Sequence, residues 1–255
     1  VSWEDALGIP VGYQGRETGQ FLVPRFVVDF LASYAARRGF EHVFDPNAGS
    51  GVLLTALVAT GGAKQGTGVL SDPELLPVAE HLSAGLPITW HLSGSLPSST
   101  PPLTGPFDAV VSFPPLIART RTETFQTQSG LVTVRDTDTH LHLLRWLSSV
   151  GETGEAVFVL PDDSLSSRAY PDSVLAQLAT FGFHLNAVVA LGDVSFGPWN
   201  WLPWNILFIS RQSTDHLFIG RLTPNQDQAS LLENLCAHRP GRIPALGALV
   251  TAKQF

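Results

Sequence analysis

The sequence predicts an α/β protein with a mainly parallel, doubly wound sheet. Short apolar runs with β-branched and aromatic residues recur along the chain, and helix-length segments separate most of them. The last two runs are joined by too few residues for a crossover helix, which indicates that they pair antiparallel. The predicted strands cover residues 42–45, 66–70, 88–92, 107–113, 156–160, 185–191 and 205–210.

The segments between these runs predict helices at residues 25–37, 52–60, 73–84, 139–150 and 171–181. In the first of them the apolar residues lie on one helical face. Pro73 and Pro171 suit the first turn of a helix, and Asp72 is a good N-cap for the third one. The Ser/Pro/Gly-rich segment 93–106 is expected to be a loop. Segment 119–135 lacks clear periodicity and is expected to be a long excursion without regular structure.

The pattern changes from Thr223 onward, where one helix at 228–237 precedes the Pro/Gly-rich segment 239–247. We therefore expect one main domain over residues 1–222, followed by a C-terminal helix and connector over 223–255. Residues 1–38 supply the N-terminal segment and first helix of the main domain.

Composition narrows the class of protein. The 255 residues include 15 Lys+Arg and 22 Asp+Glu, a formal charge of −7, and 44% are hydrophobic. These values predict a globular chain and exclude a broad basic surface for nucleic acid. No run reaches the ~18 apolar residues of a membrane span, and the N-terminus lacks signal-peptide features, so we expect a cytoplasmic protein without membrane contact.

Two residue types carry further information. The single cysteine, Cys236, excludes an internal disulfide framework and a four-cysteine zinc site. His140 and His142 lie two apart on a predicted helix and so point to different faces, and we expect no metal site there. The chain has no Met, not even an initiator, which leads us to expect a piece excised from a longer protein.

The candidate ligand loop lies between the first strand and its helix. Its residues Asp45, Pro46, Asn47, Ala48, Gly49, Ser50 and Gly51 follow the carboxyl end of that strand, where ligands bind in open α/β sheets. Glycines let a backbone come close to a ligand, and a helix N-terminus supplies free N–H groups. The loop lacks the GK[ST] of a phosphate loop and the full G-x-G-x-x-G spacing. An ordinary strand–helix turn is the alternative interpretation.

The ordered motifs resemble S-adenosylmethionine-dependent N6-adenine DNA methyltransferases, and most closely the modification subunits of type I restriction systems. The loop resembles D-P-x-x-G-S-G, residues 19–24 resemble G-Q-[FY]-x-T-P, and residues 107–116 resemble the strand that ends in N-P-P-[YF]. Residues 154–162 resemble the strand ending in V-L-P-D, and residues 187–211 resemble the final hairpin. Each motif is weak alone, but their order and spacing over residues 15–222 are specific. The resemblance implies a seven-stranded methyltransferase sheet with an antiparallel last strand, and S-adenosylmethionine as cofactor.

The target-amine motif departs from the family. The resemblance implies two acceptors, an Asn side chain and a proline carbonyl, that hold the hydrogens of the adenine amine, and an aromatic ring that stacks on the extruded base. Phe113 stands at the Asn position and has no acceptor, while Leu116 stands at the aromatic position and has no π face. Only Pro114 and Pro115 are retained.

The cofactor positions that the resemblance implies are altered as well. Phe21 and Pro24 are retained, but Val23 replaces the Thr that helps to hold the cofactor carboxylate. Leu70 stands where an acidic residue accepts the ribose hydroxyls, although Asp72 could serve if the register slips by two residues. Ser95 replaces the Asp that meets the adenine amine. Losing hydrogen bonds of this kind costs ~1–3 kcal/mol each, so cofactor binding is expected to be weak or lost. An alignment displaced by a residue or two is the alternative.

A Trp-rich segment lies at the family's base-facing hairpin. Phe196, Trp199, Trp201 and Trp204 are candidates for stacking on a base or another flat ligand. The more common reason for such a segment is a stiffened loop that closes over the pocket or packs on a partner. In the excursion over residues 119–135, Arg119, Arg121 and Arg135 could contact phosphates, but solvated loop charges are more common.

Three functions remain. The first is a catalytically degenerate N6-adenine methyltransferase-like domain that acts as a scaffold or interaction module in a DNA-modification or defence protein. The second is an active adenine-N6 methyltransferase, and the third is a binder of another nucleoside-like ligand. Whether the chain is an enzyme is left open. DNA is expected as a partner only with an additional recognition domain or subunit, and a protein partner or a larger parent chain is expected.

Overall fold

The computed structural model describes residues 23–93, 106–114, 119–127, 130–161, 174–192 and 203–251. These residues form a nine-stranded sheet in the order β11-β10-β8-β9-β7-β4-β1-β2-β3, and a separate two-stranded sheet of β5 and β6. The strands are β1 (Phe40–Asp45), β2 (Ala63–Leu70), β3 (Ile88–Leu92), β4 (Phe107–Ser112), β5 (Thr120–Thr127), β6 (Gly130–Thr137), β7 (Val150–Pro161), β8 (His184–Leu191), β9 (Trp204–Ser210), β10 (His216–Leu222) and β11 (Ala248–Thr251). The helices are α3 (Arg25–Arg38), α4 (Val52–Ala59), α5 (Leu76–Leu82), α6 (Asp138–Leu147), α8 (Val174–Thr180) and α9 (Gln228–Cys236), with short 3₁₀ turns η1 (Pro73–Leu75) and η4 (Pro244–Leu246).

The predicted doubly wound α/β sheet is confirmed. Each of the seven predicted runs is a strand, and β1, β2, β3, β4 and β7 pair in parallel. Strand β9 lies between β7 and β8 and is antiparallel to both, as the short connection predicts. The N-cap prediction at Asp72 is confirmed too, since its carboxylate accepts the Glu74 N–H (2.9 Å) at the start of η1.

The strand count differs from the expected seven. Strand β10 adds parallel to β8, and β11 adds antiparallel to β10, so the main sheet has nine strands. Neither carries a strong sequence signal, because Gly220 interrupts β10 and β11 is only four residues long. The segment expected to be a connector therefore contributes a strand to the sheet. The proposed division of the chain at residue 222 stays a prediction.

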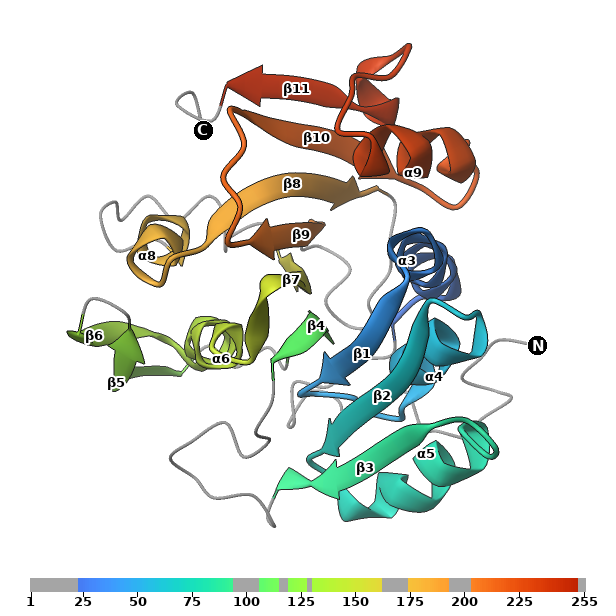
Figure 1. The fold of residues 1–255 in the computed structure, drawn as a ribbon, viewed down its shortest axis with the longest axis vertical. Helices are drawn as coiled ribbons and strands as arrows, with labels where there is room; N and C mark the ends of the chain where they lie inside the picture. The colour runs from blue at the N-terminus through green and yellow to red at the C-terminus, as the bar shows by residue number, and fades with distance from the viewer. Residues whose placement is uncertain are drawn as a thin grey trace.

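The expectation of an irregular excursion at 119–135 was wrong. Strands β5 and β6 form an antiparallel ribbon over these residues. The ribbon has a weak apolar alternation, because only Phe125 and Val134 are buried and its other positions are polar or partly exposed. It lies beside α6 at one side of the main sheet (Figure 1).

Helices cover both faces of the sheet (Figure 1). Helices α3, α4 and α9 pack on one face over one buried cluster, and α6 and α8 pack on the other face over a second cluster. Among the described residues, no helix combines the length and the apolar character needed to cross a bilayer.

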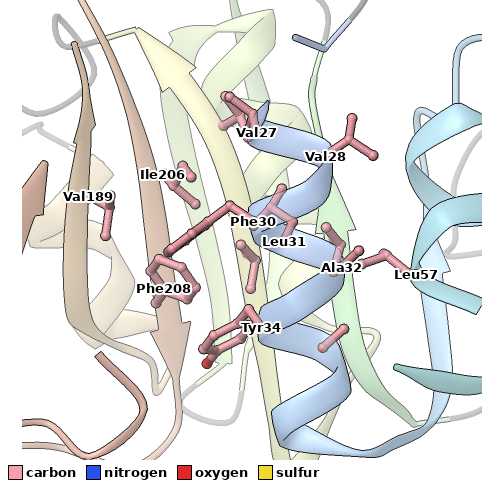
Figure 2. Close-up of a cluster of buried hydrophobic side chains, with 14 of the residues drawn as sticks. Val27, Val28, Phe30, Leu31, Ala32, Tyr34, Leu57, Val189, Ile206 and Phe208 are labelled. Atoms are coloured by element: carbon pink, nitrogen blue, oxygen red, sulfur yellow. The ribbon is translucent and has the colours of Figure 1, made fainter. Parts of the chain in front are cut away.

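Helix α3 shows how a predicted apolar face becomes a core. It begins after Pro24, and Gly39 ends it in a left-handed conformation (φ 67°), from which its N–H bonds to the Ala35 carbonyl. Its buried residues lie against strands β8 and β9 and helix α4 (Figure 2). The ring of Tyr34 meets that of Phe208 edge to face, with centroids 4.8 Å apart.

A buried polar contact also ties α3 to the sheet. The Tyr34 hydroxyl donates to Glu155 Oε2 (2.9 Å), and Arg38 lies 3.3 Å from the same oxygen. Burial raises the pKa of Glu155, against the opposing effect of the Arg38 charge. This contact lies at the amino end of the parallel strands, away from the ligand loop, so we assign it to stability.

Close packing of β2 against β3 depends on a glycine. Gly68 pairs with Trp90, and a Cβ at Gly68 would lie 2.2 Å from the Trp90 ring. The indole N–H of Trp90 donates to Ser83 Oγ (2.9 Å), which holds the ring in place.

We expect Gly68→Ala to lower the free energy of unfolding by about 1–3 kcal/mol, because the new methyl group overpacks against Trp90. Trp90→Leu in the same chain should remove most of this extra cost, and a double-mutant cycle from urea unfolding measures the coupling. Equal costs of Gly68→Ala in both backgrounds would show that the indole is not the obstacle.

Candidate functional site

The candidate ligand loop is fixed by hydrogen bonds at its start and middle. The Asn47 N–H donates to Asp45 Oδ1 (3.0 Å), and the Ala48 N–H donates to the Val69 carbonyl (2.9 Å). The second bond ties the loop to the end of β2. The Gly51 N–H then donates to the Ala48 carbonyl (2.7 Å), which closes the turn that leads into α4. The loop is therefore an ordered turn at the carboxyl ends of β1 and β2.

Two glycines give the loop its shape. Gly49 and Gly51 have φ of +55° and +82°, a region that side chains with a Cβ rarely occupy. A Cβ at Gly51 would lie 2.8 Å from the Trp90 ring, whereas a Cβ at Gly49 would meet no atom within 4 Å. Gly49 is therefore the open side of the loop, where a ligand could approach. Gly51 caps α4, whose first-turn N–H groups point toward the loop.

Asp45 lies at the base of this loop with 1% of its surface exposed. Burial raises the pKa of Asp45 to about 7, although the Asn47 N–H and the neighbouring Ser112 favour the charged form. The Ser112 hydroxyl forms no hydrogen bond of ordinary geometry among the described residues. The carboxyl group is therefore balanced between its neutral and charged forms near neutral pH.

The segment before α3 is described from Val23. Val23 is half-buried and packs against the cluster under α3 and α4. The Pro24 carbonyl accepts N–H groups from Val27 (2.9 Å) and Val28 (3.1 Å), so it starts the helix. Phe21 lies outside the described residues.

The end of β2 is apolar where the resemblance implies an acidic residue. Leu70 has 0% of its surface exposed and packs with Ala48 and Ala79. Asp72, the alternative, uses its carboxylate as the cap of η1. Ser95 lies outside the described residues, so its role stays a prediction.

The end of β4 is apolar too. Phe113 is 8% exposed, and its ring centroid lies 5.2 Å from that of Trp204 at the start of β9. Pro114 is buried beside it, whereas Pro115 and Leu116 lie outside the described residues. The Phe113 side chain is thus part of the core cluster under α3.

The Trp-rich segment is described only at its end. Trp204, in β9, pairs with Pro161 of β7 on one side and with Leu191 of β8 on the other. Because the residue is only 1% exposed, its ring contacts protein groups and not solvent. Phe196, Trp199 and Trp201, the other stacking candidates, lie outside the described residues.

Two residues near the loop escaped the sequence analysis. Ser112 faces Asp45 because β1 and β4 are neighbours, and this adjacency follows from strand order and not from a motif. Trp90 closes the space in front of Gly51 and Gly68. The signal that could have found it is the pair of glycines in β2 opposite an aromatic residue in the next strand.

The histidine pair on α6 has separate surroundings. His140 Nδ1 lies 2.9 Å from Asp136 Oδ1, while burial and the nearby Arg145 and Arg121 lower the pKa of His142 to about 3. Within the part of the chain that the structure describes, no group of three or more His, Cys, Asp or Glu side chains is arranged to hold a metal ion.

The cofactor that the resemblance implies fits the described residues only in part. The open side at Gly49 and the buried, unpartnered Nδ2 of Asn47 suit a polar ligand at the loop. At the carboxyl end of β2, however, Leu70 offers no acceptor for ribose hydroxyls and Asp72 is used by its own turn. The described residues therefore suit a polar ligand group beside Asn47 and Gly49, and they offer no acceptor for the ribose hydroxyls of S-adenosylmethionine.

Comparison with known proteins defines the class by fold. No protein-family model matches the chain. No curated protein sequence matches it either. A putative class I S-adenosylmethionine-dependent methyltransferase from Listeria monocytogenes superposes with a TM-score of 0.62 at 16% identity, over 84% of this chain and 70% of that one. The chain has the class I methyltransferase fold.

Within this class, the chain is similar to modification subunits of type I restriction systems. The methyltransferase subunit from Streptococcus thermophilus superposes with a TM-score of 0.74 at 16% identity, over 94% of this chain and 58% of that one. A modification subunit of a putative type I restriction enzyme from Vibrio vulnificus gives a TM-score of 0.66 at 18% identity, over 98% and 57%. The chain thus spans less than three fifths of the length of these subunits. The resemblance seen in the motifs is confirmed at the level of the fold.

Proposed function

We propose that this chain is an N6-adenine methyltransferase-like domain that has lost catalysis and acts as a scaffold or interaction module. Its context would be a larger cytoplasmic protein of DNA modification or defence. The observation that supports this proposal most strongly is that Phe113, which stands where the resemblance implies an Asn acceptor, is buried and packs on Trp204.

The chemistry explains why this position matters. An adenine exocyclic amine is a poor nucleophile, because its lone pair is delocalised into the ring. An enzyme that methylates it needs acceptors that hold the amine hydrogens and aim the lone pair at the methyl group. A phenyl ring has no acceptor, and an 8% exposed ring inside the core is not free to leave its place without loss of packing.

The cofactor side supports the same proposal. Leu70 and Val23 are apolar at two positions where the resemblance implies polar contacts, and Leu70 is fully buried. Each missing hydrogen bond weakens ligand binding by ~1–3 kcal/mol, so two or three together lower affinity by several orders of magnitude.

An active adenine-N6 methyltransferase is the second candidate, and the loop favours it. The ordered turn from Asp45 to Gly51 keeps two left-handed glycines and an open side at Gly49. A domain with no ligand at all has no evident need for this open side.

Calorimetric titration with S-adenosylmethionine and S-adenosylhomocysteine, together with transfer of radiolabelled methyl groups to unmethylated DNA, separates the two candidates. We expect no binding up to about 1 mM ligand and no transfer. Micromolar binding with transfer would establish the active enzyme, and micromolar binding without transfer would restrict the loss to the target amine. Gly49→Leu, which fills the open side of the loop, is the matched variant, because any binding at this loop should be lost in it.

A further inference from the structure

The ribbon of β5 and β6 is a small sheet with two edges. Its strands pair with each other over their whole length, from Thr120 with Thr137 to Thr127 with Gly130, and the register does not shift. In the part of the chain that the structure describes, no third strand pairs with either edge. An isolated pair of strands is only marginally stable, and an edge offers its N–H and C=O groups to another strand. The ribbon can therefore accept a further strand.

The more open of the two edges is that of β5. Five of the eight residues of β5 are exposed, against three of the eight residues of β6. Strand β6 also runs directly into α6, which begins at Asp138, and the ribbon lies beside this helix at one side of the main sheet (Figure 1). We therefore expect a further strand to add to β5.

The short hairpin connection identifies the backbone groups on this edge. Only two residues separate Thr127 from Gly130, and residues that flank such a connection form a hydrogen-bonded pair. Along an antiparallel ladder these pairs alternate with closer pairs whose N–H and C=O groups point away from the partner strand. The hydroxyls of Thr124 and Thr133 lie 3.0 Å apart, as expected for a closer pair. The outward backbone groups of β5 therefore belong to Thr120, Thr122, Thr124 and Gln126.

Two opposite charges on β5 restrict which strand can pair there. Arg121 and Glu123 lie on the same face of the strand, because they are two residues apart. Such charges discourage pairing with an arbitrary apolar strand. A second β5, placed antiparallel with Thr122 opposite Thr122, brings Arg121 of each copy opposite Glu123 of the other. A shift of two residues either way would instead place Arg121 opposite Arg121 or Glu123 opposite Glu123. The charge pattern of β5 is therefore complementary to itself in one register.

We propose that two copies of this chain associate through the edges of β5, antiparallel about a twofold axis at Thr122, to form a continuous four-stranded sheet. Each copy contributes the same surface, as a twofold interface requires. This inference goes beyond the proposed function, which does not identify a partner, and it does not depend on whether the domain retains catalysis. It concerns residues 120–124 and not the loop at Gly49.

Local charge balance allows two copies to approach at this edge. The whole chain has a formal charge of −7, so two copies repel each other over much of their surface. Residues 119–138, however, include three arginines and three acidic residues. Within the ribbon, Arg145 donates to Glu123 (2.7 Å) and Arg121 pairs with Asp138. The edge of β5 therefore lies in an electrically balanced part of an otherwise acidic chain.

Sedimentation equilibrium of the chain alone, up to about 1 mM, tests the proposal. The interface has few residue pairs, so we expect a Kd on the order of 100 µM. Thr122→Pro removes the outward N–H at the axis and spares the ladder with β6, and it should weaken association at least tenfold. Thr133→Pro is the matched control, because it removes the equivalent N–H from the edge of β6, and it should change the Kd less than twofold. A monomeric original chain at about 1 mM, or equal weakening by both variants, would overturn the proposal.

Disulfide trapping tests the register separately. In a Cys236→Ser background, Thr122→Cys places the two thiols across the axis, whereas Thr124→Cys places them about 14 Å apart along the strands. Under mild oxidation we expect the covalent dimer of Thr122→Cys to form at least fivefold faster than that of Thr124→Cys. Equal rates would contradict the proposed pairing. Because these samples contain neither S-adenosylmethionine nor DNA, failure here leaves the titration of the ligand loop unaffected, and failure of that titration leaves this result unaffected.

Discussion

Asp45 is expected to lower the free energy of unfolding as pH rises from about 4 to about 7, while the buried His142, with its pKa lowered to about 3, acts in the opposite direction over much of the same range. The pKa of Asp45 is about 7 in the folded protein, while in the unfolded chain it is about 4. Between these values the unfolded chain has released the proton and the folded protein still holds it, so rising pH favours unfolding. A shift of about three pKa units corresponds to ~4 kcal/mol at most.

Asp45→Asn isolates this contribution. An amide oxygen can still accept the Asn47 N–H, but the side chain no longer titrates. The difference in unfolding free energy between the variant and the original chain should change between pH 4 and pH 8, by no more than ~4 kcal/mol and in favour of the variant at high pH. Urea unfolding across this range measures it, with Asp215→Asn on an exposed loop as control. A difference that stays constant with pH would mean that Asp45 ionises as it does in the unfolded chain.

Phe113→Asn, which restores the amide of the family motif, is expected to destabilise the fold and not to restore methyl transfer. The substitution removes a buried ring from contact with Trp204 and places a polar group in an apolar cluster. Together these effects cost about 2–4 kcal/mol. Urea unfolding and a radiolabelled methyl-transfer assay give the two readouts.

Phe113→Leu is the control for this variant. It keeps an apolar side chain in the cluster and should cost less than about 1.5 kcal/mol if the site can repack. Methyl transfer by the Asn variant and none by the original chain would mean that Phe113 alone separates this chain from activity, which would contradict the expected loss of cofactor binding. Unchanged stability would mean that the Phe113 ring is not part of the core.

The strands with strong apolar patterning can be predicted from the sequence. The strands at the β10–β11 edge of the main sheet and in the separate ribbon cannot. Strands such as β7, with the run Ala156–Leu160 buried on both faces, are continuous apolar segments and are readily recognised. The β5–β6 ribbon was missed because Phe125 and Val134 are its only buried side chains, and a helix next to it supplies the rest of the apolar surface. Such a ribbon depends on tertiary contacts that a local pattern does not contain.

The candidate site, too, could be predicted from the sequence only in part. The loop from Asp45 to Gly51 was predicted from its glycines, and the structure gives it the expected left-handed turns. The neighbours of the loop were not predicted, because Ser112 and Trp90 reach it from β4 and β3 through strand adjacency. The residue types at positions 70 and 113 indicated missing polar groups, but only the structure shows that both side chains are part of the core.

The position of β9 determines the order in which the chain can complete its sheet. Strand β8 is synthesised before β9, yet β9 lies between β7 and β8. While the ribosome is still adding residues up to Ser210, the half-sheet from β3 to β7 can assemble, but β8 has no partner on the β7 side. Helix α3 likewise lacks its neighbour α9 until that much later segment has been synthesised. Nascent chains of this protein therefore expose a strand edge of β7 and an apolar face of α3 until β9 and α9 have been synthesised.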